Sequence, residues 1–291
     1  MTDVSTSSPT PTLVSADAGP TLLQRSDVQV SLRNGEVDWD SFVPESYWQV
    51  NYQTLRNDDQ SIIQMVGEFF SRHFRNTPRE HSLRALDVGS GGNLHPALAL
   101  LPWSALVTLT DVSAPNLAWL RAAAAGRQAL DERGAWVWQP FWAEYARCPG
   151  YQQVGDPRAE LAIRHEVRHQ DVLTLPPQSW DLGTMFFVAE SITTDEAEFA
   201  AATRAFGRAL VPGAPFAAAF MDRAVGYQVA NRSFPTVRTV DLETVRAVVA
   251  EFSADAVVEP VDVPPHDPEQ DGYQGMIVAV GTIRADPGQS S

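Results

Sequence analysis

The residues best placed to do chemistry lie in a glycine-rich turn. The stretch reads Leu86-Asp87-Val88-Gly89-Ser90-Gly91-Gly92-Asn93, an apolar strand followed by the turn and then by the start of a helix. Glycine lets the backbone turn tightly and lets a ligand approach closely, because no Cβ stands in the way. The N-terminus of the following helix presents free N–H groups to a carboxylate or a phosphate. We therefore expect a cofactor with an anionic group at this turn.

Acidic residues at the ends of neighbouring strands narrow the class of cofactor. Asp111 follows the next apolar strand, 20 residues after Gly91, where a carboxylate can accept hydrogen bonds from both ribose hydroxyls. Asp171 ends the third strand and is placed to accept from an adenine amino group. Asp87, before the turn, suits the ammonium of a methionine group, whose carboxylate would take the helix N–H groups.

The pattern favours S-adenosylmethionine over a dinucleotide. A dinucleotide site requires Gly-x-Gly-x-x-Gly, and Leu94 stands where the third glycine belongs. A purely structural glycine turn is the remaining alternative. We predict S-adenosylmethionine as the cofactor, S-adenosylhomocysteine as its product, and no metal.

The bulk properties exclude several classes of partner. The chain has 291 residues and a formal net charge of −15, with Arg residues scattered singly, so nucleic acid is a poor partner. No apolar run approaches the roughly 18 residues of a membrane helix, and we expect no membrane contact. The single cysteine, Cys148, excludes an intramolecular disulfide. We predict a cytoplasmic monomer that acts on a small molecule.

Strands and helices alternate along most of the chain, which indicates a mostly parallel sheet with helices on both faces. Strands are expected at residues 83–88, 105–110, 163–168, 180–188, 215–221, 256–263 and 275–283. Helices are expected at residues 58–74, 93–101, 115–125, 195–210 and 241–252. No helix separates the last two strands, so these should pair antiparallel. The predicted fold is α/β: a Rossmann-like, doubly wound, seven-stranded sheet with an antiparallel last strand.

Composition divides the chain into a domain and two tails. Residues 1–36 are rich in Ser, Thr, Pro, Asp and Gly and are expected to form a disordered tail. The domain is expected at residues 37–285, with N-terminal helices at 37–75 and a second tail at 286–291. Residues 131–160 do not fit the alternation and are interpreted as an insertion, whose aromatic cluster we assign to core packing.

The sequence resembles the class I methyltransferases, and within them the family of nicotinamide, phenylethanolamine and indolethylamine N-methyltransferases. The glycine turn alone indicates only class I, whereas the Tyr47/Tyr52 pair ahead of the domain is the specific part. The matching pieces are Phe42-Val-Pro-Glu-Ser-Tyr47 with Tyr52, Leu86-Asp-Val-Gly-Ser-Gly91, Thr110-Asp111 with Asn116, Asp171-Val172, Phe187-Val-Ala-Glu190-Ser191, Leu210-Val-Pro-Gly213, Met221-Asp222, Gly226-Tyr227 and Gly275.

The resemblance implies roles for individual residues. Tyr47 and Tyr52 would belong to an N-terminal lid over the cofactor and the substrate, and Asp222 and Tyr227 would face the substrate. With the turn included, the predicted cofactor residues are Tyr47, Tyr52, Asp87, Gly89, Ser90, Gly91, Asn93, His95, Asp111, Asn116, Asp171, Val172 and Phe187. The predicted substrate residues are Tyr47, Glu190, Asp222 and Tyr227.

The sequence also departs from the family. Gly92-Asn93 stand where Pro-Thr is usual, and His95 stands where a Tyr typically follows. The region after Asp222 lacks the Ser pair of the nicotinamide enzymes. The resemblance therefore predicts the reaction better than the methyl acceptor. An amine or ring nitrogen is our first hypothesis. O- or S-methyl transfer and a non-catalytic cofactor-binding module are the alternatives.

Methyl transfer is an in-line displacement, so the enzyme must hold the acceptor collinear with the S–CH3 bond. A base is needed only where the acceptor arrives protonated. Asp222 and Glu190 are the candidate bases, and Tyr47 is the third candidate catalytic residue.

Each candidate also has a simpler interpretation. Tyr47 and Tyr52 could be core aromatics. They are five residues apart and would not share a helix face, so we expect a break between them. Asp222 and Glu190 could be solvated acids after strands, and His95 could contact the cofactor or cap a helix.

Overall fold

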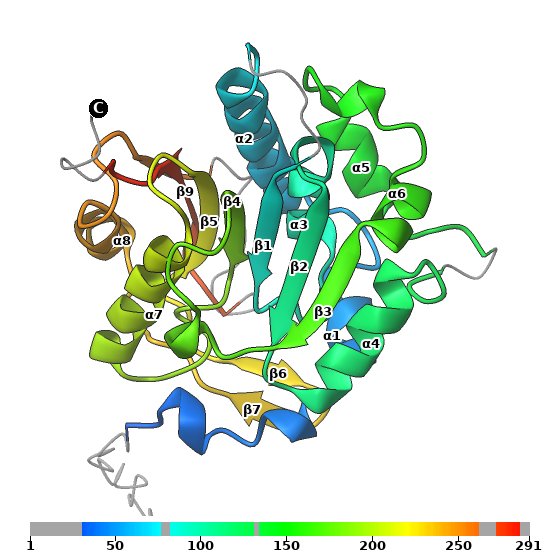
Figure 1. The fold of residues 1–291 in the computed structure, drawn as a ribbon. Helices are drawn as coiled ribbons and strands as arrows, with labels where there is room; N and C mark the ends of the chain where they lie inside the picture. The colour runs from blue at the N-terminus through cyan, green and yellow to red at the C-terminus, as the bar shows by residue number, and fades with distance from the viewer. Residues whose placement is uncertain (1–30, 77–81, 131–133, 262–271, 286–291) are drawn as a thin grey trace, which may run out of the picture. The chain divides into compact units, whose positions relative to one another are not determined.

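A seven-stranded sheet organises the folded domain. The computed structural model describes residues 31–76, 82–130, 134–261 and 272–285. The strand order is β3-β2-β1-β4-β5-β9-β8 (Figure 1). The strands are β1 (Arg84–Val88), β2 (Leu106–Asp111), β3 (His165–His169), β4 (Leu182–Phe186), β5 (Pro215–Asp222), β8 (Val257–Pro260) and β9 (Gly275–Thr282). All seven expected strands are present, with their ends shifted by a few residues.

The pairing confirms the doubly wound arrangement. β1 pairs in parallel with β2 on one side and with β4 on the other, and β2–β3 and β4–β5 are also parallel. β9 pairs antiparallel with both β5 and β8, as expected of the last two strands. The chain therefore winds outward in both directions from β1 and β4. The carboxyl ends of these two strands flank a crevice, the usual place for a ligand in an open α/β sheet.

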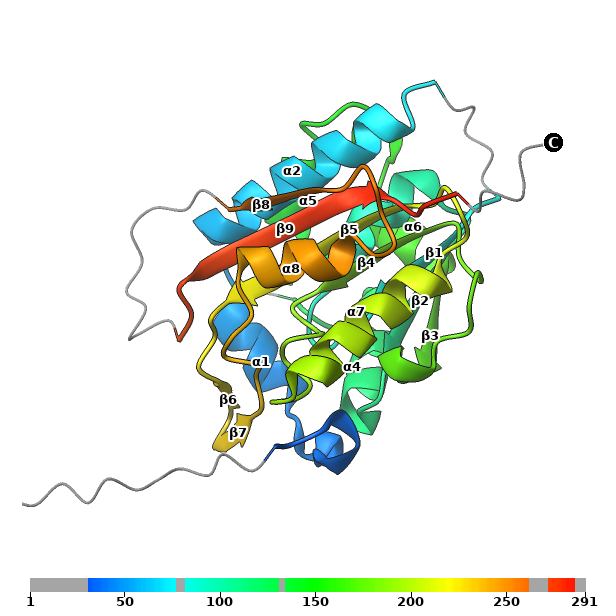
Figure 2. The same cartoon turned by 90° about the vertical axis from the view of Figure 1, so that its left-hand side faces the viewer.

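Helices cover both faces of the sheet because the strand residues alternate between two cores. In β1, Ala85 faces the core that contains α2, whereas Leu86 faces the core that contains α7. Figure 2 shows α2 and α8 on opposite sides of β9. The helices of the first face are α2 (Asn57–His73), α3 (His95–Leu100), α4 (Ala114–Ala124), α5 (Gln139–Tyr145) and α6 (Pro157–Ile163). Those of the second face are α7 (Glu196–Ala209) and α8 (Leu242–Val249).

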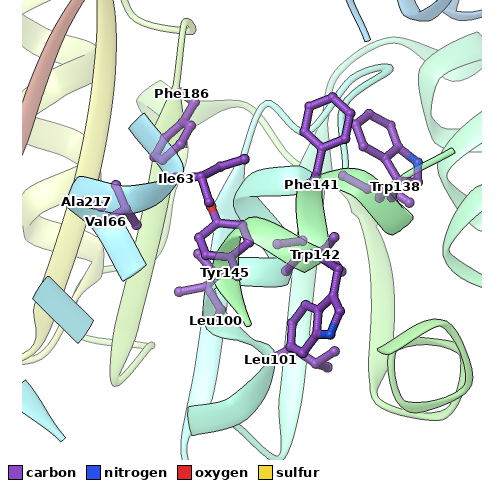
Figure 3. Close-up of a cluster of buried hydrophobic side chains, with 14 of the residues drawn as sticks. Ile63, Val66, Leu100, Leu101, Trp138, Phe141, Trp142, Tyr145, Phe186 and Ala217 are labelled. Carbon is purple, nitrogen blue, oxygen red and sulfur yellow. The ribbon is translucent and has the colours of Figure 1, made fainter. Parts of the chain in front are cut away.

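Residues 134–160, the described part of the expected insertion, contribute α5 and α6 to the first core. The aromatic side chains of this segment are buried, which confirms their assignment to core packing. Figure 3 shows them packed against side chains of α2 and of the chain that follows α3. The labelled members are Ile63, Val66, Leu100, Leu101, Trp138, Phe141, Trp142, Tyr145, Phe186 and Ala217.

The N-terminal part of the domain begins earlier than expected. Asn34 is buried and opens a short helical turn (Asn34–Glu36), and Leu32 is hydrogen-bonded to Thr194. Residues 31–36 therefore belong to the folded domain and not to the tail expected up to residue 36. The polar composition of this segment concealed its buried hydrogen bonds. The rest of that tail, residues 1–30, and the expected tail at 286–291 lie outside the described residues.

Two small elements close the carboxyl edge of the sheet. The helix α1 (Pro44–Asn51) carries Tyr47, and its axis ends before Tyr52, which has non-helical backbone angles. The expected break between the two tyrosines is therefore present. A hairpin of β6 (Tyr227–Val229) and β7 (Arg232–Phe234) follows β5. Within the described ranges, no helix combines the length and apolarity needed to cross a membrane.

Candidate active site

One pocket of about 360 Å³ lies at the carboxyl ends of β1, β2 and β4, where the winding of the sheet reverses. Thirteen of the sixteen predicted site residues line it. They are Tyr47, Tyr52, Asp87, Gly89, Ser90, Gly91, Asn93, Asp111, Asn116, Asp171, Val172, Phe187 and Tyr227. The other three, His95, Glu190 and Asp222, are outside the lining.

The glycine turn has the backbone that only glycine adopts easily. Gly89 and Gly91 have φ of +61° and +50°, in the left-handed region. A Cβ on Gly89 would lie 2.6 Å from a methyl carbon of Val188, and a Cβ on Gly91 would occupy the space beside the Asp111 carboxylate, at 3.8 Å. The turn therefore leaves room next to Asp111 for a ligand.

Asp87 presents an unsatisfied oxygen to this end of the pocket. Its Oδ1 accepts a hydrogen bond of 2.8 Å from the Thr184 hydroxyl. Its Oδ2 is buried and has no hydrogen-bond partner among the described residues. Burial raises the pKa of Asp87 to about 7. A cationic group bound at Oδ2 would satisfy this oxygen and favour the ionised carboxylate.

Asp111 joins the turn to α4. Its Oδ2 accepts from the Gly91 N–H at 3.0 Å and from the Asn116 side-chain amide at 3.2 Å, and its Oδ1 accepts from the Ser113 N–H at 2.8 Å. Burial raises the pKa of Asp111, although these donors act in the opposite direction. The amide oxygen of Asn116 is buried without a partner in the described part of the chain. The arrangement offers a vicinal diol both a carboxylate and an amide oxygen.

The side chain of Asp171 is held by a residue that the sequence did not suggest. The Asn34 side-chain amide donates to both carboxylate oxygens, at 3.1 Å each. The Trp39 indole N–H donates in turn to the Asn34 side-chain oxygen at 2.9 Å. Both Asn34 and Trp39 line the pocket. Neither carried a sequence signal, because both lie near or inside the polar segment expected to be a tail.

Aromatic rings form another part of the pocket lining. The Tyr47 ring lies 5.8 Å from that of Tyr52 and 6.4 Å from that of Tyr227, measured between centroids. Burial raises the pKa of Tyr47 to about 12, so its hydroxyl stays protonated. Phe187, directly after β4, has a φ of +59°, an uncommon and strained conformation for a residue with a side chain. This strain turns the chain sharply at the pocket wall.

Glu190 lies directly behind the lining. It is fully buried, and its Oε1 accepts from the Met221 N–H at 2.9 Å, whereas Oε2 has no partner among the described residues. Burial raises the pKa of Glu190 to about 8. Its neighbours in the chain and across the sheet, Ser191 and Met221, both line the pocket.

The structure does not bring Asp222 into the pocket. The carboxylate lies partly buried at the end of β5, 3.9 Å from the Arg223 guanidinium, which also pairs with Asp241 at 3.0 Å. Burial still raises the pKa of Asp222, and the positive charge of Arg223 opposes this shift. The expectation that Asp222 faces the substrate therefore stays a prediction, since its carboxylate lies outside the lining of this pocket.

His95 is also outside the lining, and its side chain is a core group. The imidazole is fully buried, stacks on Phe141 at 5.6 Å and has no hydrogen-bond partner among the described residues. Its Nε2 lies 3.7 Å from Oδ1 of Asp59. Burial lowers the pKa of His95 to about 3 and raises that of Asp59 to about 8, so both are neutral at pH 7. The side chain neither contacts the pocket nor caps a helix.

Further lining residues come from segments that are distant in sequence. The Arg56 guanidinium donates to the Tyr273 hydroxyl at 3.1 Å, which joins the start of α2 to the segment before β9. Asn51, at the end of α1, lies on the same stretch of wall. No periodicity or motif marks these residues, since only the tertiary fold brings them together. Across the described residues, no group of three His, Cys, Asp or Glu side chains is arranged to hold a metal ion.

Comparison with known structures gives fold similarity at low sequence identity. The CurJ carbon methyltransferase matches with a TM-score of 0.48 and 11% identity, over 86% of this chain and 62% of that chain. A DhpI–SAH complex matches with a TM-score of 0.41 and 16% identity, over 80% and 100% of the two chains. An S-adenosylmethionine-dependent methyltransferase from Mesorhizobium loti matches with a TM-score of 0.41 and 16% identity, over 73% and 95%. No curated protein sequence matches the chain.

The strand order, the single antiparallel strand and the glycine turn at the crevice define the fold of class I S-adenosylmethionine-dependent methyltransferases. The sequence profile of the NNMT/PNMT/TEMT family matches residues 32–279. The chain belongs to this family.

Proposed function

We propose that the protein transfers the methyl group of S-adenosylmethionine to the nitrogen of a small-molecule amine or heterocycle. The supporting observation is that one pocket combines two chemically different sets of residues. One set is the glycine turn with Asp87 and Asp111, and the other is the aromatic side chains of Tyr47, Tyr52 and Tyr227, near the buried Glu190 carboxyl.

The first set of residues suits each part of the cofactor. The open oxygen of Asp87 would pair with the methionine ammonium, and Asp111 with Asn116 would bind the ribose hydroxyls. Asp171 and Val172, beyond Asp111 along the wall, would face the adenine. When bound, S-adenosylmethionine supplies a methyl group on a positively charged sulfur, which is already a good leaving group.

The second set of residues would orient the acceptor and exclude water. Tyr47, Tyr52 and Tyr227 present ring faces and edges, which attract a cationic or aromatic amine. Holding the nitrogen in line with the transferred methyl supplies a large part of the rate. Glu190, with one open buried oxygen, would take the proton from an acceptor that arrives as an ammonium. A neutral ring nitrogen would not need this step.

The test is an acceptor panel with methyl-labelled S-adenosylmethionine. The panel contains primary and secondary amines, pyridine-type heterocycles, phenols and thiols, and mass spectrometry locates the label. We expect label on nitrogen in at least one amine or heterocycle, and much less label with Asp111→Ala at the same, non-saturating cofactor concentration. Label confined to phenols or thiols would contradict the choice of nitrogen. Tight binding of S-adenosylhomocysteine without transfer to any acceptor would favour a non-catalytic binding protein.

A further inference from the structure

Residues 32–42 form a segment, here termed the strap, that is tied to the domain at both ends. At one end, the Leu32 N–H donates to the Thr194 hydroxyl at 2.7 Å, and the Thr194 N–H donates to the Leu32 carbonyl at 2.8 Å. At the other end, the Ala114 N–H at the start of α4 donates to Asp40 at 2.8 Å. The strap, blue in Figure 1, therefore runs along the carboxyl edge of the sheet from the start of α7 to α4.

Asn34 is the most highly connected residue of the strap. Its backbone N–H donates to Glu198 at 2.9 Å, and its carbonyl accepts from the Trp39 indole at 3.1 Å. Its side-chain oxygen accepts from the same indole at 2.9 Å, and its side-chain nitrogen donates to both oxygens of Asp171. Only 4% of the residue is exposed. A buried amide with both ends engaged has a single orientation, because exchanging its oxygen and nitrogen would break the bonds at both ends.

The orientation of Asn34 fixes the orientation of Asp171. A carboxylate has about four acceptor positions. Asn34 uses one on each oxygen, and the Leu173 N–H uses a second on Oδ1 at 2.9 Å. Among the hydrogen bonds of the described residues, one acceptor position on Oδ2 remains open, and Asp171 lines the pocket. The pocket therefore presents one fixed acceptor, and no donor, at this point of the Asp171 side chain.

We propose that Asn34 is a positioning residue that makes the pocket selective for a 6-aminopurine over a 6-oxopurine base. The proposal rests on the proposed function, because it requires the adenine of the cofactor to lie next to Asp171. The exocyclic amino group of adenine donates to the open position on Oδ2. A 6-oxopurine presents a carbonyl at the same place, so two acceptors would face each other and the site would reject it. Without Asn34, the carboxylate can rotate away and this discrimination is lost.

The experiment compares two ligands that differ only in the C6 substituent and the proton on the adjacent N1, S-adenosylhomocysteine and S-inosylhomocysteine, by calorimetry. The variants are Asn34→Ala, Asn34→Asp, which keeps the size but removes the donor, and Trp39→Phe, which removes only the indole N–H. Arg33→Ala is the matched control, because Arg33 lies in the strap and pairs with Asp195 at 3.1 Å outside the pocket lining. Melting curves establish that each variant is folded.

We expect wild type and Arg33→Ala to prefer the adenosyl ligand by at least about tenfold, the factor that one lost hydrogen bond to a charged group gives. Asn34→Ala and Asn34→Asp should bring the ratio of the two dissociation constants close to one, and Trp39→Phe should reduce it partly. If the Asn34 variants weaken both ligands equally, Asn34 is only part of the wall and the proposal fails. If wild type binds neither ligand, it is the proposed function that fails.

Discussion

The carboxyl groups of Asp87 and Glu190 have the same hydrogen-bonding state. In each, one oxygen accepts a hydrogen bond and the other is buried without a partner among the described residues. Burial raises their pKa values to about 7 and about 8. A buried carboxylate with an open oxygen is costly unless a cation lies beside it. At the residue scale, these two buried carboxyls therefore favour positively charged ligands. An ammonium group and a sulfonium are both ligands of this kind.

The first prediction concerns Glu190 as a base. In the free protein its carboxyl is protonated below about pH 8 and becomes able to accept a proton above it. For a heterocyclic ammonium acceptor of known pKa, kcat/KM should therefore rise with pH toward about 8 beyond the change that the acceptor itself explains. Glu190→Gln should remove this additional rise of kcat/KM with pH. It should also lower the maximum kcat/KM by about 100-fold, the lower range for general-base catalysis.

The comparison variant is Asp222→Asn, since this carboxylate lies 3.9 Å from the Arg223 guanidinium, whereas Glu190 is fully buried with no cation beside it among the described ion pairs. Asp222→Asn should keep the additional rise of kcat/KM toward pH 8. If Asp222→Asn loses this rise and Glu190→Gln keeps it, Asp222 and not Glu190 is the base.

The second prediction concerns Asp111. Asp111→Ala should weaken the binding of both S-adenosylmethionine and S-adenosylhomocysteine by about 1.5–3 kcal/mol, the usual loss for a hydrogen bond to a charged group. The variant should also melt lower, because Asp111 accepts from the Gly91 and Ser113 N–H groups. Asp156→Ala is the control, since Asp156 also accepts from two backbone N–H groups but lies outside the lining. Calorimetry should show normal binding in the control, and equal loss in both variants would remove Asp111 from the site.

At the scale of elements, α1 and its end separate two tyrosines with different environments. Tyr52 is only 4% exposed and belongs to the first core, whereas Tyr47 is half-buried and packs against the edge of that core. Both line the pocket. The helix therefore places Tyr47 in the pocket wall, while Tyr52, directly after the helix, lies in the interior. We expect Tyr52 to contribute more to the stability of the fold than Tyr47.

The third prediction uses this difference. Tyr52→Ala should reduce the free energy of unfolding by about 3–5 kcal/mol, as for other buried aromatic residues. Tyr47→Ala should lower it less and should lower the single-turnover rate more, because closure of the pocket sets alignment and water exclusion. Tyr→Phe at either position should change stability little, since the ring stays buried. Denaturant midpoints and single-turnover rates on the same samples test this. A strongly destabilised Tyr47→Ala with an unchanged rate per folded molecule would contradict a lid role.

The elements that could be predicted from sequence are those with strong local patterns. Buried parallel strands such as β1 are short apolar runs, and the acids that follow them identify the carboxyl edge of the sheet. The strap, α5 and the β6–β7 hairpin could not be predicted with the same reasoning. Their residues are polar, aromatic or too few to show a period, and the fold that surrounds them decides their conformation.

The residues of the candidate site also divide into those that a local sequence pattern predicts and those that it does not. Gly89, Asp111 and Asp171 follow strands and were predictable from spacing. Asn34 and Arg56 reach the pocket from segments with no motif, so only tertiary contacts reveal them. Asp222 was predicted from its place after a strand and through resemblance, and its carboxylate lies outside the lining, 3.9 Å from the Arg223 guanidinium.

At the scale of the whole molecule, the folded domain begins with the strap. The fourth prediction is that deletion of residues 2–20 leaves the melting temperature and the affinity for S-adenosylhomocysteine unchanged, because this segment has little apolar sequence to bury. Deletion of residues 2–36 should lower both, since it removes Asn34 and the Leu32 hydrogen bonds. Calorimetry and thermal melting measure the two quantities. Equal behaviour of the two deletions would show that residues 21–36 contribute nothing.

The position of β9 has a consequence for how the chain is assembled. β9 follows β8 in sequence but lies between β5 and β8, and among the described strands β8 pairs only with β9. A nascent chain that has emerged as far as β8 therefore exposes an open sheet edge along β5 and a strand that has no place to dock. Such edges are templates for pairing with other chains. Arrival of β9 pairs β5 and β8 at once, so a chain that has emerged only as far as β8 stays open to pairing with other chains until β9 inserts.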